Sequence, residues 1–201
     1  MLFSVWKEQP AGYFSVSSRS KDGQWKDYFF KTQEEVKQWL VNKKLTGSDL
    51  YFCTTTFSSP KRKKDNIISS RYLWQDLDES DPNKLPPNLR PTIAWQSSPG
   101  RYQALWRLEK SYKAKDIEKL NKALAKRVKA DQGSWILTKV LRIPGTKNYK
   151  YPATPTVKLL WETGKSYTYN ELVKLTGQEE EKAEESFPEA DEVNYSSFLK
   201  R

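Results

Sequence analysis

The alternation of hydrophobic and polar positions along the chain predicts short strands, interrupted by a few stretches with helical spacing. Early in the chain, two runs rich in Phe, Tyr, Trp and Val flank the turn residues Lys21-Asp22-Gly23, as expected of a hairpin. Thr32 and Glu35 then stand at the spacing of a helix capping box. The elements predicted for this part are a hairpin over residues 3–30, a helix that begins at Thr32 and a buried strand over residues 50–57.

The rest of the chain continues the same mixture. Residues 71–79 begin as an aromatic strand and end in carboxylates, and residues 114–128 carry one apolar stripe opposite a row of lysines, which predicts a helix. Ser97-Ser98-Pro99-Gly100 predicts a turn. The further predicted elements are strands at 92–95 and 101–108, a closing pair of strands at 157–161 and 167–169, and a short helix at 171–175.

The amino-acid composition excludes several kinds of site. The chain of 201 residues contains one cysteine and no histidine, so it cannot form disulfides within itself, zinc sites built on Cys or His, or a Ser-His-Asp triad. Cys53 lies inside an apolar run and is expected to be a small buried residue. Any metal site must therefore use carboxylate ligands.

Neither a membrane span nor a secretion signal is expected. No apolar run approaches the roughly 20 residues that a transmembrane helix needs, and the N-terminal residues lack a signal-peptide pattern. We therefore expect a soluble, cytoplasmic protein without a membrane partner, made of one substantial domain or of one domain with a small appendage.

The net charge of +10 is unevenly distributed. Residues 179–201 hold eight acidic and three basic residues, a net −5, which leaves +15 on residues 1–178. This positive charge on residues 1–178, together with 13% aromatic residues, favours binding to nucleic acid. The alternative is that the lysines only keep the protein soluble. The Glu-rich, low-complexity segment 178–201 is expected to be a flexible acidic tail.

Two basic clusters are candidates for contacts with phosphate. The run Lys61-Arg62-Lys63-Lys64 directly precedes the acidic strand and could contact a nucleic-acid backbone, although such a run can equally be a solvated face. Arg142, Lys147 and Lys150 surround the tight turn at Pro144-Gly145 and could bind phosphate. The alternative for Arg142 is a structural clamp on backbone carbonyls.

The carboxylates at the end of the acidic strand are the candidate metal ligands. In a regular strand Asp76 and Asp78 fall on the same face, about 7 Å apart along the chain. Two neighbouring carboxylates repel each other unless a cation lies between them, and hard divalent cations prefer oxygen ligands. An acidic turn that is merely solvated explains the same residues equally well.

Three stretches together resemble one family: residues 75–79 (QDLDE), 97–106 (SSPGRYQALW) and 141–150 (LRIPGTKNYK). They are similar to the catalytic core of the archaeo-eukaryotic primase superfamily, in particular the RepB-like primase–polymerases of plasmids and phages. The resemblance implies an α+β fold in which an N-terminal α/β module packs on an RRM-like palm with a mostly antiparallel sheet. The domains expected on this basis are a catalytic domain at 1–177, divided into a module at 1–70, a palm at 71–165 and a closing helix at 166–177, followed by the tail at 178–201.

The resemblance also implies roles for individual residues. Asp76 and Asp78 fall on the first family motif and Asp131 on the third, as ligands of two Mg²⁺ or Mn²⁺ ions. Lys61, Arg62, Lys63 and Lys64 would follow the template backbone. The implied nucleotide-binding residues are Ser98, Arg101, Gln103, Arg142, Lys147 and Lys150. Gln103 departs from the family, whose members commonly have a histidine there, and its neutral amide would make a weaker hydrogen bond to phosphate.

The function that follows from the resemblance is a DNA primase or polymerase that synthesises or extends primers by two-metal nucleotidyl transfer. Its partners would be a single-stranded or primed DNA template, ribo- or deoxynucleoside triphosphates, and a helicase domain or protein. Two alternatives remain open: a primase-like binding module that has lost activity, and an origin-recognition domain. Metal-dependent nucleotide incorporation on a primed template separates the enzyme from both.

Overall fold

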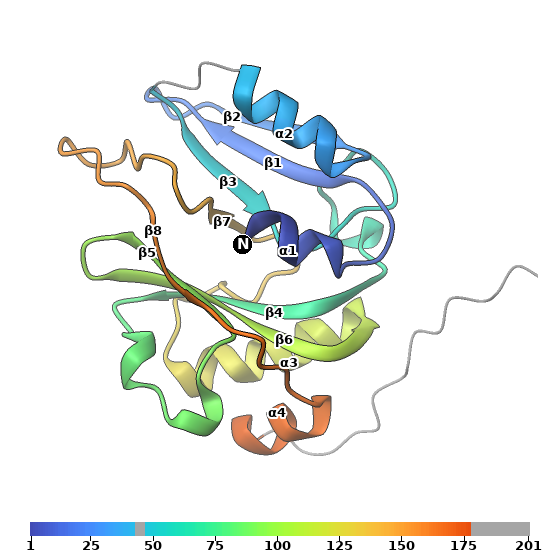
Figure 1. The fold of residues 1–201 in the computed structure, drawn as a ribbon. Helices are drawn as coiled ribbons and strands as arrows, with labels where there is room; N and C mark the ends of the chain where they lie inside the picture. The colour runs from blue at the N-terminus through green and yellow to red at the C-terminus, as the bar shows by residue number, and fades with distance from the viewer. Residues whose placement is uncertain (43–46, 178–201) are drawn as a thin grey trace, which may run out of the picture.

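Two four-stranded antiparallel sheets face each other in the computed structural model, which describes residues 1–42 and 47–177 (Figure 1). Helix α2 lies over the outer side of the first sheet, and helices α3 and α4 lie beneath the second. The architecture is the predicted α+β class, with every strand pair of the two sheets antiparallel. The acidic tail predicted at 178–201 lies outside the described residues.

The first sheet is built on the predicted hairpin and is covered by the predicted capped helix. Helix α2 (Gln33–Asn42) begins with the expected capping box, because Thr32 Oγ1 accepts from Glu35 N at 3.2 Å and the Glu35 carboxylate accepts from Thr32 N at 3.1 Å. Trp39 of this helix packs on Tyr28 with ring centroids 4.6 Å apart. The strands, in the order β2-β1-β3-β7, are Trp25–Phe30, Phe14–Arg19, Asp49–Cys53 and Val140–Arg142.

The second sheet carries the acidic strand and places it beside the Gln103 strand. Asp76 of β4 is opposite Gln103 of β6, and Gln103 is opposite Trp95 of β5. Its strands, in the order β4-β6-β5-β8, are Ser69–Asp78, Arg101–Lys113, Ile93–Ser98 and Lys158–Glu162. The remaining elements are helices α3 (Ala114–Val128) and α4 (Tyr169–Thr176), with short 3₁₀ turns η1 (Lys64–Asn66), η2 (Pro82–Lys84) and η3 (Pro87–Leu89).

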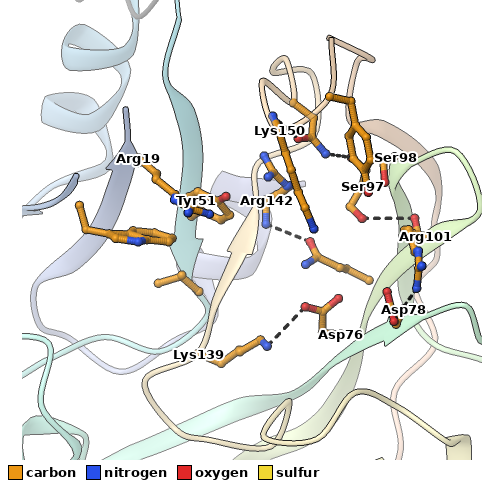
Figure 2. Close-up of a pocket in the computed structure, with 15 residues that line it drawn as sticks. Arg19, Tyr51, Asp76, Asp78, Ser97, Ser98, Arg101, Lys139, Arg142 and Lys150 are labelled. Atoms are coloured by element: carbon orange, nitrogen blue, oxygen red, sulfur yellow. Dashed lines mark hydrogen bonds and ion pairs between the residues drawn. The ribbon is translucent and has the colours of Figure 1, made fainter. Parts of the chain in front are cut away.

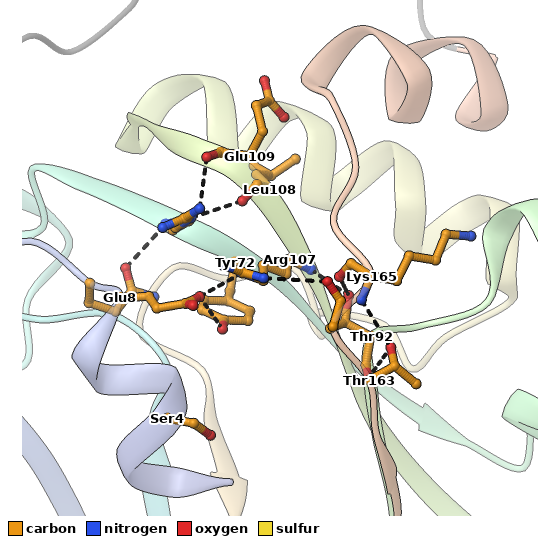
Figure 3. Close-up of polar contacts among 12 residues, drawn as sticks. Ser4, Glu8, Tyr72, Thr92, Arg107, Leu108, Glu109, Thr163 and Lys165 are labelled. Atoms are coloured by element: carbon orange, nitrogen blue, oxygen red, sulfur yellow. Dashed lines mark hydrogen bonds and ion pairs between the residues drawn. The ribbon is translucent and has the colours of Figure 1, made fainter.

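The N-terminal residues form a helix, which corrects the hairpin predicted from residue 3. Helix α1 (Leu2–Lys7) lies between the two sheets, and its Trp6 Nε1 donates to the Cys53 carbonyl at 2.9 Å. At its C-terminal end Glu8 accepts from the Tyr72 hydroxyl at 2.7 Å and pairs with Arg107 Nε at 2.7 Å (Figure 3). The aromatic residues that suggested a strand are buried here by a helix that connects both sheets.

Two strand pairings also differ from the predictions. Strand β8 pairs with β5, and not with residues 167–169, because Thr168 is the N-cap of α4 and Tyr167 forms a bridge with Leu108. Strand β7 comes late in the chain but completes the first sheet beside β3. The boundaries at residues 70 and 165 stay predictions. None of the helices in the described ranges combines the length and the apolar character required to cross a bilayer.

Candidate active site

A cavity of about 480 Å³ lies where the two sheets face each other, and it contains most of the predicted site residues (Figure 2). This volume is within the range of about 300–1,000 Å³ that is typical of small-molecule sites. Figure 2 shows Asp76 at the floor, Asp78 and Arg101 on one side, and Arg19 and Tyr51 on the other.

Asp76 and Asp131 are brought together although 54 residues separate them in the sequence. The backbone N–H of Asp131 donates to the Asp76 carbonyl at 2.9 Å, directly after the end of α3. Lys139 Nζ lies 3.4 Å from Asp76 Oδ2 and 3.6 Å from Asp131 Oδ2, so one ammonium pairs with both carboxylates. Lys139 was not among the predicted site residues, because an isolated lysine before a short strand has no motif that marks it.

The loop that carries Asp131 and Lys139 is fixed by a buried polar network. Gln75, the neighbour of Asp76, donates to the Asn121 side chain at 3.1 Å and accepts from Ser134 Oγ. All three side chains are fully buried. Trp74 Nε1 donates to the Ile136 carbonyl at 3.2 Å and holds the same loop. A satisfied buried network of this kind rigidifies its surroundings, so the backbone segments that carry Asp76 and Asp131 are held together.

Strand β4 is irregular at its last residue, Asp78, which corrects the expectation of a regular strand through Asp76 and Asp78. A register shift separates the two residues in the β4–β6 ladder, and Asp78 has φ of +50°, in the left-handed region. Its carboxylate pairs with Arg101 Nη1 at 2.5 Å, and Glu79 pairs with Arg101 Nη2 at 3.0 Å. The hydrogen bond that the Arg101 guanidinium donates to the Asp78 carboxylate raises the pKa of Arg101. Each strand-end aspartate therefore has its own basic partner.

Gln103 is buried in the cavity wall and is held through its amide oxygen. That oxygen accepts from Trp95 Nε1 at 3.0 Å and from the Arg142 backbone N–H at 2.9 Å. The amide nitrogen has no hydrogen-bond partner among the described residues, and Gln103 lines the cavity. The amide therefore connects the two sheets and has donors left for a ligand.

The Arg142 guanidinium is occupied by a partner that the sequence did not indicate. Its Nη1 and Nη2 lie 2.8 and 3.0 Å from the two carboxylate oxygens of Asp49, and both side chains are less than 10% exposed. Asp49 also accepts from the Tyr149 N–H at 2.6 Å. Burial opposes ionisation of Asp49, but the bonds from Arg142 and Tyr149 outweigh it and lower its pKa. Burial raises the pKa of the adjacent Tyr51 to about 12.

The remaining predicted nucleotide-binding residues divide into two groups. Ser98, at the end of β5, and Lys150, in the loop after β7, line the cavity. Asn148 of that loop holds the two segments together by donating to the Ser97 carbonyl at 2.8 Å. Lys147 does not line the cavity, and its Nζ donates to Thr156 Oγ1 at 2.9 Å. The structure thus brings together every predicted nucleotide-binding residue except Lys147.

The basic loop at residues 61–64 lies outside the cavity and is only partly available. Arg62 pairs with Asp27 at 3.0 Å and donates to the Thr138 carbonyl, next to Lys139. Lys64 pairs with Glu118 at 2.5 Å. Lys61 and Lys63 are exposed and have no ion pair among the described residues. Two of the four cations therefore contribute to the fold, and two are free to contact a polyanion.

Asp76, Asp78 and Asp131 carry the oxygen ligands that a divalent metal site needs, but their side chains do not converge on one point. Among residues 1–42 and 47–177 no three Asp, Glu, His or Cys side chains converge in the manner of metal ligands. Asp76 and Asp131 nevertheless supply the oxygen ligands that hard cations prefer. The Lys139 ammonium already lies close to both carboxylates, so this position attracts positive charge. The two carboxylates fit Mg²⁺ or Mn²⁺ if that ammonium moves, and Asp78, which lines the same cavity as Asp76, pairs with Arg101 through one carboxylate oxygen.

The fold has been seen before in solved structures. Primase RepB′ matches with a TM-score of 0.66 and 22% sequence identity over 88% of this chain, which spans 60% of the length of that one. The catalytic domain of primase RepB′ in complex with initiator DNA matches with a TM-score of 0.64 and 22% identity over 88% of this chain and 93% of that one. The cyanophage S-2L primase-polymerase AEP domain matches with a TM-score of 0.66 and 13% identity over 87% of this chain and 94% of that one.

These identities establish a shared fold and no more. A search of curated proteins found no match. The family model for the RepB DNA-primase N-terminal domain, however, matches residues 30–184, which is more than three quarters of the chain. The matched range includes every predicted site residue, whereas Arg19, which also lines the cavity, precedes it. The chain therefore belongs to the RepB DNA-primase N-terminal domain family.

Proposed function

We propose that this domain is a DNA-dependent primase or polymerase that joins nucleotides along a template strand, in the replication of a plasmid or phage-like element. The observation that carries the proposal is that Asp76 and Asp78 line one nucleotide-sized cavity together with basic side chains, while Asp131 lies next to Asp76 and shares its partner Lys139. A cavity that recognises only a polyanion would not concentrate carboxylates at its floor, because they repel phosphate.

The residues of the cavity would have distinct tasks. Asp76, Asp78 and Asp131 would hold Mg²⁺ or Mn²⁺, which, when bound, activates the attacking 3′-hydroxyl and neutralises charge on the leaving group. The free amide N–H groups of Gln103 and the Lys150 ammonium would orient the phosphates of the incoming nucleotide. Ser98 and Arg101 line the same wall and would extend this phosphate-binding surface, the latter once released by Asp78.

A primer-synthesis assay tests the proposal directly. Single-stranded DNA is supplied with Mg²⁺ or Mn²⁺ and labelled nucleotide, in parallel mixtures that contain ribonucleotides only or deoxynucleotides only. We expect metal-dependent products that elongate with time, together with extension of a pre-annealed primer. DNA binding without any incorporation in all mixtures would contradict the proposal.

A nucleic-acid-binding domain without synthesis is the second candidate. The observation that favours it is that Asp76, Asp78 and Asp131 all have basic partners within the protein, so metal is not needed to balance their charge. In that case DNA affinity would be the same with chelator as with Mg²⁺. For the enzyme, metal would be required for incorporation whatever its effect on binding.

The position of the Lys139 ammonium leads to a prediction for metal binding. Replacing Lys139 with methionine removes the competing cation from between Asp76 and Asp131. We expect Mn²⁺ to bind at least about fivefold more tightly, because one unit charge at 4 Å is worth roughly 1 kcal/mol even in bulk water. Calorimetric titration of the protein with Mn²⁺, without DNA or nucleotide, measures the change.

Two controls accompany this measurement. Lys84→Met removes an exposed charge that does not line the cavity and should leave Mn²⁺ affinity unchanged. Adding Asp76→Asn to Lys139→Met should abolish the gain, since a ligand is then missing. Equal affinities of wild type and Lys139→Met would place the metal away from these carboxylates.

Only Lys61 and Lys63 of the basic loop lack an ion pair among the described residues, so the prediction for template binding concerns these two lysines. Neutralising the unpaired Lys61 and Lys63 to glutamine should weaken single-stranded DNA binding for all sequences alike. The slope of log affinity against log salt should fall by about 1.4, since each phosphate contact to a single strand contributes roughly 0.7. Fluorescence anisotropy at several salt concentrations measures the slope. An unchanged slope would identify the run as a solvated face.

The matched control removes two exposed lysines elsewhere, Lys84 and Lys158. It keeps the net charge equal to that of the Lys61 and Lys63 variant. A slope that falls equally in both variants would indicate a general charge effect and contradict a contact made by this loop.

A further inference from the structure

Trp25 is the most exposed tryptophan of the protein and faces the cavity. It is 48% exposed, while Trp6, Trp74, Trp95 and Trp106 are at most 1% exposed. It lies on β2, at the edge of the first sheet, and lines the cavity that contains Asp76. About half of the Trp25 side chain is therefore open to solvent at the cavity, where a ligand can contact it.

The indole packs against Tyr51, and Tyr51 in turn packs against the Arg142 guanidinium. Its ring centroid lies 4.9 Å from that of Tyr51, and the Arg142 guanidinium carbon lies 4.8 Å from the Tyr51 centroid. The Tyr51 hydroxyl donates to Asp49 at 3.3 Å, which fixes the ring that supports Trp25. The indole therefore needs little ordering before it can accept a planar ligand, and this lowers the cost of binding.

A cation with no acidic partner lies beside the exposed ring. Arg19 is directly opposite Trp25 in the β1–β2 ladder, and its guanidinium carbon is 5.7 Å from the indole centroid. Among the described residues Arg19 has no ion pair, and it also lines the cavity (Figure 2). A planar apolar surface next to a free guanidinium matches the two parts of a nucleotide, a base that stacks and a phosphate that needs a counter-charge.

We infer that Trp25 and Arg19 form a subsite that stacks a nucleobase and binds its phosphate at the rim of the cavity. The inference rests on the proposed function for the identity of the ligand, but it concerns binding and not synthesis. The base could belong to the template strand or to the incoming nucleotide, which share this chemistry. Both would lie with the base against the indole and the phosphate toward Arg19.

The test compares Trp25→Ala with Trp25→Phe, which keeps an aromatic ring. Loss of one stacked base should weaken binding by about 5- to 150-fold in Trp25→Ala, whereas Trp25→Phe should retain most of the affinity. One arm measures binding of a single-stranded 16-mer deoxyoligonucleotide by anisotropy, and the other measures binding of dATP with Mn²⁺ by calorimetry. A loss in the first arm assigns the base to the template strand, and a loss in the second assigns it to the incoming nucleotide.

Ligands without bases provide the internal control. An oligonucleotide with abasic sites and inorganic tripolyphosphate keep the phosphates, so Trp25→Ala should leave their binding within about twofold while Arg19→Gln weakens it. Val41→Ala, which truncates another exposed apolar side chain on α2, should change nothing. Unchanged affinity of Trp25→Ala for both the 16-mer and dATP would overturn the inference, as would equal losses for ligands with and without bases.

The outcome is separable from that of the proposed function. The oligonucleotide arm requires neither synthesis nor metal and can be repeated in Asp76→Asn. If wild type makes no product but Trp25→Ala still loses affinity for bases, the inferred subsite is supported and the proposed polymerase activity is contradicted. If synthesis occurs while Trp25→Ala binds normally, the polymerase stands without this subsite.

Discussion

Asp76→Asn is expected to lower nucleotide incorporation by at least about 10³-fold, which corresponds to roughly 4 kcal/mol of lost transition-state stabilisation. Asparagine keeps the shape of the side chain but removes the charge that faces Asp131 and Lys139. The side chain is 27% exposed and accepts no buried hydrogen bond through its carboxylate, so the fold should survive. Single-turnover extension of a primed template at saturating nucleotide measures the rate.

The matched control is Asp22→Asn, which makes the same chemical change in a turn that does not line the cavity. It should retain the wild-type rate. Circular dichroism and thermal melting should show the same fold for both variants. An Asp76→Asn enzyme that still incorporates nucleotide at the wild-type rate would remove Asp76 from the reaction.

Asp49→Ala is expected to have the largest effect on stability, lowering the free energy of unfolding by about 3–5 kcal/mol, as expected when one partner of a buried ion pair is removed. Arg142 would remain buried without its bidentate partner, and the Tyr149 N–H would lose its acceptor. Urea unfolding at pH 7 measures the loss. A loss below about 1 kcal/mol, as for an exposed pair, would contradict the buried clamp.

Replacing both Asp49 and Arg142 distinguishes the contribution of the ion pair from the cost of leaving one buried charge unpaired. Asp49→Leu combined with Arg142→Met removes both charges and should recover much of the stability lost in Asp49→Ala, because no uncompensated buried charge remains. Arg142→Lys keeps the charge but cannot pair bidentately. A raised nucleotide KM with little loss of stability in Arg142→Lys would indicate phosphate binding, whereas lost stability with an unchanged KM would indicate a structural clamp.

The same pair gives the protein a defined dependence on pH. The pKa of Asp49 lies below its ordinary value of 3.8 in the folded state. The ion pair therefore stabilises the protein fully above that value, and the stabilisation is lost as the pH falls through the folded-state pKa. The stability difference between wild type and Asp49→Asn should accordingly narrow on acidification. A gap that stays constant between pH 7 and pH 3 would exclude this contribution.

The sequence by itself determined the elements whose signals are local. The capping box at Thr32 and the apolar stripe of residues 114–128 predicted helices that the structure contains, since caps and helical periodicity depend only on residues a turn or two apart. The acidic strand end, the turn before Arg101 and the Arg142–Lys150 turn were also identified locally. Together with the family resemblance they placed most of the cavity walls.

Only the tertiary structure decided which of these segments meet and which charges pair. Lys139 contacts Asp76 and Asp131 because β7 crosses to the first sheet, and Asp49 holds Arg142 from a strand 93 residues away. Helix α1 was mistaken for a strand because its aromatic residues are buried between two sheets, a burial that removes the helical pattern of polar positions. Ion pairs and burial between distant segments depend on three-dimensional proximity, and no spacing along the chain encodes that proximity.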